Sequence, residues 1–350
     1  MSARPPEAVA SLSPIAYKDL PGWGETEAVA LLSGVSRHAV PAIFSRRHEA
    51  PWLADLAGAL QDGLQDARAT VERIFQPLRI GSEGFLTGYY EPVVTASRVR
   101  EGPFQTPLYR RPDDLVRVDP PEPSLPGDGT FARMVDGKTE AYPDRTAISE
   151  GALDGKGLEL AFLADPVDAF FIQVQGSARL VFPDGTATRI GYHGKTGHSY
   201  TAIGRVLIDR GFLPEGGATM QTIRAILAAR PDIVPGILAA NRSYVFFRER
   251  PDPGRDLGPI AAGGLPLVPL RSLAVDRAHI KLGTPVYVET DIPRRGPHNG
   301  VMIAEDTGSA IIGPARGDVF MGSGDGAGAI AGEMKAAATL TLFLPRAALP

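Results

Sequence analysis

Apolar residues recur at helical spacing in the first quarter of the chain. Between residues 60 and 74 the intervals are three or four residues, at Leu60, Leu64, Ala67, Val71 and Ile74. This period places the apolar side chains on one face, so we predict an amphipathic helix over 60–74. A turn over 19–26, anchored by Trp23, leads into a second predicted helix that begins near residue 27.

Two further segments have the pattern of strands. Residues 85–94 are rich in aromatic and β-branched side chains, which favours a strand that ends near Pro92. Residues 171–177 alternate, with Ile172 and Val174 on one side and polar side chains on the other. This alternation predicts a strand with one polar face.

The polar face of that second strand is a candidate sugar-binding surface. It would carry Gln173, Gln175 and Ser177. Each amide both donates and accepts hydrogen bonds, which suits sugar hydroxyls and acetamido groups, and a solvent-facing sheet is the equally weighted alternative. A turn at 183–186 then predicts a hairpin, with 189–192 as the returning strand.

The second half of the chain alternates between short helices and short strands. We predict helices over 200–210 and 220–229, and strands over 244–248, 267–270, 272–276, 285–288, 300–304 and 340–344. Short strands separated by turns about every ten residues favour a barrel over a parallel α/β sheet. The predicted fold class is therefore mainly β with peripheral helices.

Composition narrows the possible functions. The chain has 350 residues, 43% of them hydrophobic, and a net charge of −4, so it can form sizeable cores but offers no basic field for nucleic acid. It has no cysteine, which excludes disulfides, thiolate nucleophiles and a lipid-modified cysteine. No signal peptide and no apolar run of about 20 residues is evident.

Aspartates near predicted strand ends are the candidate chemical groups. Asp276, Asp306 and Asp318 each follow or begin a predicted strand, and a barrel can bring such ends together so that one carboxylate tunes another. Taken singly, such aspartates are more often turn caps. The glycine-rich segment 322–328 lacks the residues of a phosphate-binding loop, and His193 and His198 lack partners at a zinc-like spacing.

Several motifs together carry a family resemblance. They are Asp19 to Trp23, Thr87 to Pro92, Phe171 to Ser177, Gly191 to Lys195, Leu273 to Asp276 and Glu305 to Gly322. In this order they resemble the membrane-bound lytic murein transglycosylase A family. The resemblance implies a double-psi β-barrel with a smaller inserted β-domain and a glycan-binding groove between them. A proline-rich break over 97–129 agrees with the start of the insertion, so we expect N-terminal helices and the first barrel part over 1–100, the insert over 101–190 and the rest of the barrel over 191–350.

The resemblance also implies an activity. Members cleave the β-1,4 bond between N-acetylmuramic acid and N-acetylglucosamine and leave a 1,6-anhydro end. Matching the motifs makes Asp318 the catalytic residue and Asp306 and Asp276 its supporting residues. The expected substrate-binding residues are Thr87, Tyr89, Gln173, Gln175, Ser177, Tyr192 and Lys195.

The expected partner is the glycan strand of peptidoglycan, bound by a periplasmic monomer that needs no cofactor or metal. Related proteins associate with the outer membrane, but this sequence has no anchor for it. The alternatives are a hydrolytic glycosidase on a related polysaccharide and a non-catalytic protein that binds wall polysaccharide.

Overall fold

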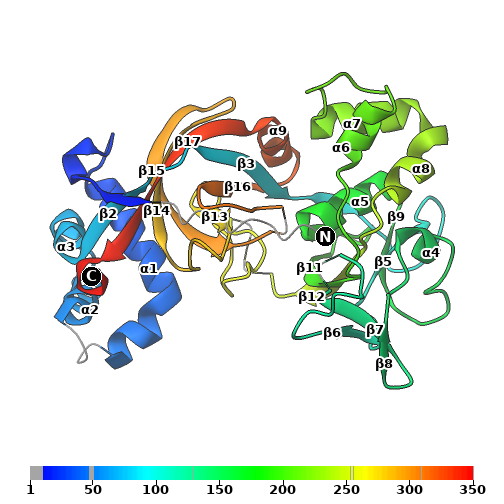
Figure 1. Cartoon of the computed structure of the whole chain (residues 1–350), viewed down its shortest axis with the longest axis horizontal. Helices are drawn as coiled ribbons and strands as arrows, with labels where there is room; N and C mark the ends of the chain where they lie inside the picture. Colours follow the sequence, from blue (N-terminus) through cyan, green and yellow to red (C-terminus); the bar gives the residue numbers. More distant parts are fainter. Residues whose placement is uncertain are drawn as a thin grey trace. The chain divides into compact units, whose positions relative to one another are not determined.

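The computed structural model describes residues 11–46, 51–127, 129–252, 254, 256–308 and 310–349. The chain forms two compact units (Figure 1). The first, called the barrel unit, comprises the described residues up to Tyr90, those from Gly254 to Gly322 inclusive, and those from Gly326 onward. The second, called the inserted unit, comprises Glu91–Asp252 and Ser323–Asp325.

Six strands of the barrel unit close into a barrel. They are β3 (Gly84–Glu91), β13 (Ser272–Val275), β14 (Pro285–Ile292), β15 (Gly296–Asp306), β16 (Arg316–Ser323) and β17 (Lys335–Pro345). Their order is β17-β14-β15-β13-β16-β3, and β3 pairs again with β17, which leaves no open edge within this ring. The prediction of a mainly β fold built on a barrel is confirmed. The flanking strands β1 (Leu12–Pro14) and β2 (Phe75–Ile80) extend the sheet from β17.

Three helices of the barrel unit pack against its sheet: α1 (Glu25–Arg46), α2 (Pro51–Gln61) and α3 (Ala67–Ile74). Their buried faces share one core with barrel strands, for example Leu31 of α1 with Ile303 of β15. The approach is close, because a Cβ on Gly34 would lie 2.4 Å from the Ile303 side chain. The prediction of one helix over 60–74 was wrong: Gly63, Leu64 and Asp66 have positive φ and separate α2 from α3.

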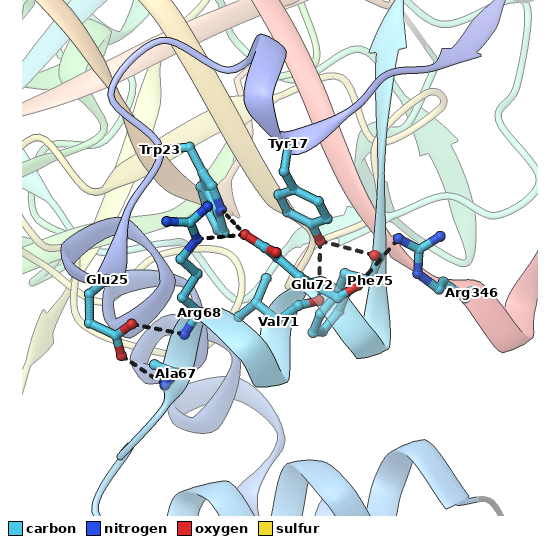
Figure 2. Close-up of polar contacts among 9 residues, drawn as sticks. All are labelled: Tyr17, Trp23, Glu25, Ala67, Arg68, Val71, Glu72, Phe75 and Arg346. Atoms are coloured by element: carbon cyan, nitrogen blue, oxygen red, sulfur yellow. Dashed lines mark hydrogen bonds and ion pairs between the residues drawn. The ribbon is translucent and has the colours of Figure 1, made fainter.

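The turn before α1 is fixed to α3 by polar contacts (Figure 2). The Trp23 indole N–H donates to Glu72 at 3.0 Å, and the Glu25 carboxylate accepts from the backbone N–H of Ala67 at 2.8 Å. The Tyr17 hydroxyl lies within hydrogen-bond distance of the Phe75 carbonyl, at 2.9 Å. Trp23 is partly buried against the core, as the sequence predicts for the 19–26 turn.

The inserted unit contains three small sheets. The largest has the order β12-β11-β10-β4, from β4 (Val93–Thr95), β10 (Ser177–Val181), β11 (Ala187–Lys195) and β12 (Val245–Arg250). The others pair β5 (Thr106–Tyr109) with β9 (Glu159–Leu163), and join β6 (Leu115–Arg117), β7 (Phe131–Val135) and β8 (Lys138–Glu140). The predicted hairpin around 183–186 is confirmed as β10–β11.

The remaining elements are short. The inserted unit has helices α4 (Arg145–Ser149), α5 (Pro166–Gln175), α6 (Ile203–Asp209), α7 (Met220–Ala229) and α8 (Val234–Ala239), and α9 (Asp325–Glu333) follows β16. Single 3₁₀ turns cover Tyr17–Asp19, Pro231–Ile233 and Arg346–Ala348. Among the described residues, no helix combines the length and the apolar character needed to cross a bilayer. The expected end of the insert at residue 190 falls inside β11, whose pairing with β12 carries the inserted unit on to Asp252.

Two strand predictions were wrong. Residues 171–175 lie in α5, because the Asp165 carboxylate caps its N-terminus by accepting from the Val167 N–H at 2.8 Å, and Gly176 ends it at φ +77°. These local signals outweighed the alternation of polar residues. The strand predicted over 267–270 is absent because the chain turns there, with Leu270 at φ +59°.

Candidate active site

Asp306 and Asp318 lie at the same level of the barrel, on the two strands that flank β13. The register pairs Ala274 with Asp306 of β15 on one side and with Asp318 of β16 on the other. Neighbouring strands are about 4.8 Å apart, so the two aspartate Cα atoms are separated by about 10 Å. The residue between them has only a methyl side chain, which leaves space between the two carboxylates.

Asp318 is the more strongly organised of the two carboxylates. The Thr87 hydroxyl of β3 donates to Asp318 Oδ1 at 2.7 Å, and Arg316 Nη2 in turn donates to the Thr87 oxygen at 2.7 Å. Burial raises the pKa of Asp318 to about 6, against the hydrogen bond from Thr87 and the charge of Arg316, which both lower it. The residue nevertheless keeps some exposed surface. A carboxyl group with this pKa can both give and take a proton near neutral pH.

Asp306 has a different environment. Its Oδ2 accepts from the Tyr89 hydroxyl at 3.1 Å, and its Oδ1 accepts from the Ala262 N–H at 3.1 Å. Burial raises its pKa, while the backbone N–H groups of Ala262 and Thr307 and the Tyr89 hydroxyl act in the opposite direction. Both oxygens therefore accept hydrogen bonds, one from a side chain of β3 and the other from the backbone of the loop at Ala262.

The Asp276 carboxylate accepts hydrogen bonds from two backbone N–H groups. The residue follows β13, and its two oxygens accept from the N–H groups of Ala278 at 2.9 Å and Gly313 at 2.8 Å. The first bond caps the turn after β13, and the second holds the loop between β15 and β16. This loop leads directly into Arg316 and Asp318, so Asp276 is bonded to the backbone segment that precedes the candidate acid.

One buried carboxylate was not predicted from the sequence. Glu305 is fully buried next to Asp306. Its carboxylate accepts from the Ser272 hydroxyl and lies 2.9 Å from His38 Nε2 and 3.5 Å from Arg37 Nη1. Both basic side chains come from α1, and His38 is 267 residues away from Glu305 in the sequence. No local sequence signal connects residues so far apart, although an acidic residue beside a predicted catalytic strand end could have been flagged.

The predicted binding residues divide between the two units. Thr87 and Tyr89 lie in the barrel unit, where the structure places their hydroxyl groups on Asp318 and Asp306. The other five lie in the inserted unit: Gln173, Gln175, Ser177, Tyr192 and Lys195.

The shared strand face on which three of these assignments rested does not exist. Gln173 and Gln175 belong to α5, and Ser177 begins β10. Gln173 and Ser177 are buried, whereas 44% of Tyr192 is exposed. Substrate binding by these residues stays a prediction.

Family comparisons match both parts of this architecture. Residues 85–248 match the family described as the MltA specific insert domain, and residues 271–344 match the 3D domain. The match to the 3D domain spans Asp276, Asp306 and Asp318. The chain is thus a barrel protein that carries this insert and an aspartate-bearing barrel segment.

Individual relatives agree with this class. A crystal structure of a membrane-bound lytic murein transglycosylase from Agrobacterium tumefaciens is 40% identical, with a TM-score of 0.82 over 97% of this chain and 98% of that one. Escherichia coli MltA with bound chitohexaose is 26% identical, with a TM-score of 0.73 over 97% and 95%. The chain belongs to the membrane-bound lytic murein transglycosylase A family.

A curated relative gives the extent of the sequence match. Membrane-bound lytic murein transglycosylase A of Escherichia coli strain K12 is 35% identical over 255 residues. The match covers 70% of this chain but only 61% of the length of that relative.

Proposed function

We propose that this protein is a lytic transglycosylase that cleaves the β-1,4 bond between N-acetylmuramic acid and N-acetylglucosamine in peptidoglycan. The observation that carries the proposal is the state of Asp318: a mostly buried carboxyl group with a pKa of about 6, positioned by Thr87 and still partly exposed. Family membership and the chitohexaose bound by the Escherichia coli relative support a glycan substrate.

One carboxyl group suffices for this reaction. Protonated Asp318 gives its proton to the glycosidic oxygen as the bond to the muramyl C1 breaks. The resulting carboxylate then takes the proton of the muramyl C6 hydroxyl, whose oxygen forms the new bond to C1. The product is a 1,6-anhydro end, water is not consumed, and Asp318 is protonated again.

The Arg316–Thr87–Asp318 chain suits this cycle. Thr87 keeps its donated hydrogen bond when Asp318 becomes a carboxylate, because its own oxygen accepts from Arg316. A hydrogen bond to a charged group is stronger than one to a neutral group, so the pair stabilises the carboxylate that forms in mid-reaction. Burial prevents that carboxylate from being stabilised so far that it could no longer act as an acid.

The hydrolytic alternative would require a second carboxylate to activate water. Asp306 is the candidate by position, since both aspartates pair with Ala274. However, its two oxygens accept from Tyr89 and Ala262, which favours a structural task. We therefore assign Asp306 and Asp276 to the support of the site.

The products of the reaction test the proposal. Purified sacculi are incubated with the protein, and the soluble fragments are weighed by mass spectrometry. The expected products are anhydromuropeptides. Each is about 18 Da lighter than its hydrolysed counterpart, because no water molecule is added when the bond is cleaved. Muropeptides with reducing muramic acid ends would instead establish a hydrolase.

The binding-only alternative is tested with Asp318→Asn, which changes little volume but removes the transferable proton. Retained glycan binding with turnover lost would support the assignment. A wild-type protein that binds sacculi and releases nothing would refute it.

The location and assembly are proposed on the same basis. Since peptidoglycan is the proposed substrate, we place the protein in the periplasm, where it would act as a monomer. Association with a membrane is proposed because the relatives are described as membrane-bound. Fractionation of cells that express the chain, followed by sedimentation of the purified protein, checks both points.

A further inference from the structure

A cluster of arginines on the inserted unit has no role in the proposed reaction. It lines a pocket of about 350 Å³ that is formed by Arg110, Arg111, His193, Phe247, Arg248 and Glu249. This pocket, called here the arginine pocket, is built from β11, β12 and the segment after β5, and these strands lie together in the inserted unit (Figure 1). Its volume suits a small ligand group better than a single ion.

The backbone is adapted to bring these side chains together. The pairing of β11 with β12 shifts register between Tyr192 and Gly194, so His193 is the extra residue of a β-bulge. Gly194 has φ +147°, and a Cβ at this position would lie 3.3 Å from the Arg111 side chain. The glycine therefore lets Arg111 approach the strand closely. Arg248 and Arg250 occupy alternate positions of β12 and leave it on the same face.

The charges of this cluster are poorly balanced. Arg110 lies 3.6 Å from Glu249, which offsets one of the pocket's arginine charges. Arg111 donates to the Leu115 carbonyl and has no carboxylate partner among the described residues. Arg248 is exposed and likewise has no ion pair within the part of the chain that the structure describes.

Arg250 adds a further positive charge beside the pocket. Its Nε is buried and makes no hydrogen bond with any described residue. Burial lowers its pKa, and so does the charge of Arg248. The pKa of His193 is lowered by burial and then by the charges of Arg248, Arg111 and Arg250. His193 is thus held neutral, and the arginines repel one another.

Other arginines of the inserted unit are arranged differently. Arg133 lies 2.9 Å from Asp114, and Arg242 lies 2.8 Å from Asp144. Each of these two arginines has a carboxylate beside it. Like charges gathered around a pocket without such partners are stabilised when an anion enters, because each guanidinium gains a charge-assisted hydrogen bond.

We propose that the arginine pocket binds a carboxylate group of the substrate strand. The inference rests on the proposed function, since it takes the ligand from peptidoglycan. Two sources offer this chemistry: the lactyl carboxylate of a muramic acid without peptide, and the carboxylates of a peptide stem. Tyr192 of β11, which is 44% exposed beside the bulge, would contact the adjoining sugar.

The test compares three ligands by isothermal titration calorimetry, with the full chain carrying Asp318→Asn to prevent turnover. The ligands are chitohexaose, which has no carboxylate, a peptide-free murein oligosaccharide and a disaccharide tripeptide. The test variant adds Arg248→Gln and Arg250→Gln. The matched control adds Arg117→Gln and Lys138→Gln, which remove two charges from exposed positions of the same unit outside the pocket.

The pocket variant should bind carboxylate-bearing ligands about tenfold or more weakly, because it loses the charge-assisted hydrogen bond of Arg248 and the positive charge of Arg250 beside the pocket. Chitohexaose should bind it unchanged, and the control should behave like the parent. Loss of affinity for the peptide-free oligosaccharide alone identifies the lactyl group as the source, because the tripeptide has its lactyl carboxyl bound in an amide. Loss for the tripeptide alone identifies the stem, and loss for both shows that the pocket accepts either carboxylate.

Two results would overturn the inference: an equal loss for chitohexaose, or no loss with any ligand. Either of them, combined with anhydromuropeptide release by the wild-type protein, leaves the proposed function intact. If the parent binds none of the glycans and the wild type releases nothing, both proposals fall. Unchanged circular dichroism and melting temperature establish that the variants are folded.

Discussion

Thr87→Val is the most direct test of how Asp318 is tuned. Valine has nearly the shape of threonine but cannot donate the hydrogen bond that the Asp318 carboxylate now accepts at 2.7 Å. This hydrogen bond lowers the pKa of Asp318, so its removal should raise that pKa above its present value of about 6. A hydrogen bond to a charged group is worth about 1.5 to 3 kcal/mol, and 1.36 kcal/mol corresponds to one pKa unit, so we expect a rise of about 1 to 2.

The measurable consequence is the position of the alkaline limb of the pH–rate profile. The proposed reaction starts from protonated Asp318, so kcat/KM should fall as the pH rises through the pKa. With a pKa of about 6, the carboxyl group is protonated in about a tenth of the molecules at pH 7. In the variant this limb should lie about 1 to 2 pH units higher, whatever happens to the maximal rate.

A matched control exists on the barrel itself. Thr341 of β17 is fully buried, and its hydroxyl has no hydrogen-bond partner within the described chain, so Thr341→Val should leave the profile unchanged. An unmoved limb in Thr87→Val would contradict the role of the hydrogen bond. A limb that moves to lower pH would mean that Arg316, released from Thr87, controls the carboxyl group by charge alone.

Three other outcomes follow from the same contacts. Asp318→Asn should raise the free energy of unfolding by up to about 3 kcal/mol at pH 8, because the pKa of Asp318 is about 6 in the folded state and 3.8 in the unfolded state. Thermal melts should show that this gain disappears as the pH falls below about 4. Tyr89→Phe, which frees one oxygen of Asp306, should lower activity less than Asp306→Asn in the sacculus assay. Trp23→Phe, which deletes the donor to Glu72, should cost about 1 kcal/mol in urea unfolding, whereas an unchanged midpoint would show the hydrogen bond to be neutral.

The barrel could be predicted from the sequence because each of its longer strands has a recognisable local pattern. Alternating β-branched and aromatic residues between turn signals mark β14, β15 and β17, and the predicted segments lie inside the observed strands. The secondary structure was predicted wrongly where two local signals favoured different elements. At 171–175 the polar alternation indicated a strand, but Asp165, Pro166 and Gly176 are the cap, first residue and stop signal of a helix. Together these three residues identify α5.

The candidate site was only partly predictable, for a different reason. Asp306 and Asp318 stand out as acidic residues near strand ends, but the partners that make them unequal come from β3. The hydrogen bonds from Thr87 and Tyr89 depend on which strands adjoin in the closed barrel, and a local pattern carries no such information. The same applies to His38, which reaches Glu305 from α1.

The closure of the barrel by β3 also constrains how the protein comes to be folded. Thr87 and Asp318 are 231 residues apart in sequence, and the inserted unit occupies most of the chain between them. Contacts this distant form slowly, whereas the inserted unit has its own cores and can fold while synthesis continues. During translation, therefore, the growing chain remains without its candidate acid–threonine pair until β16 has left the ribosome.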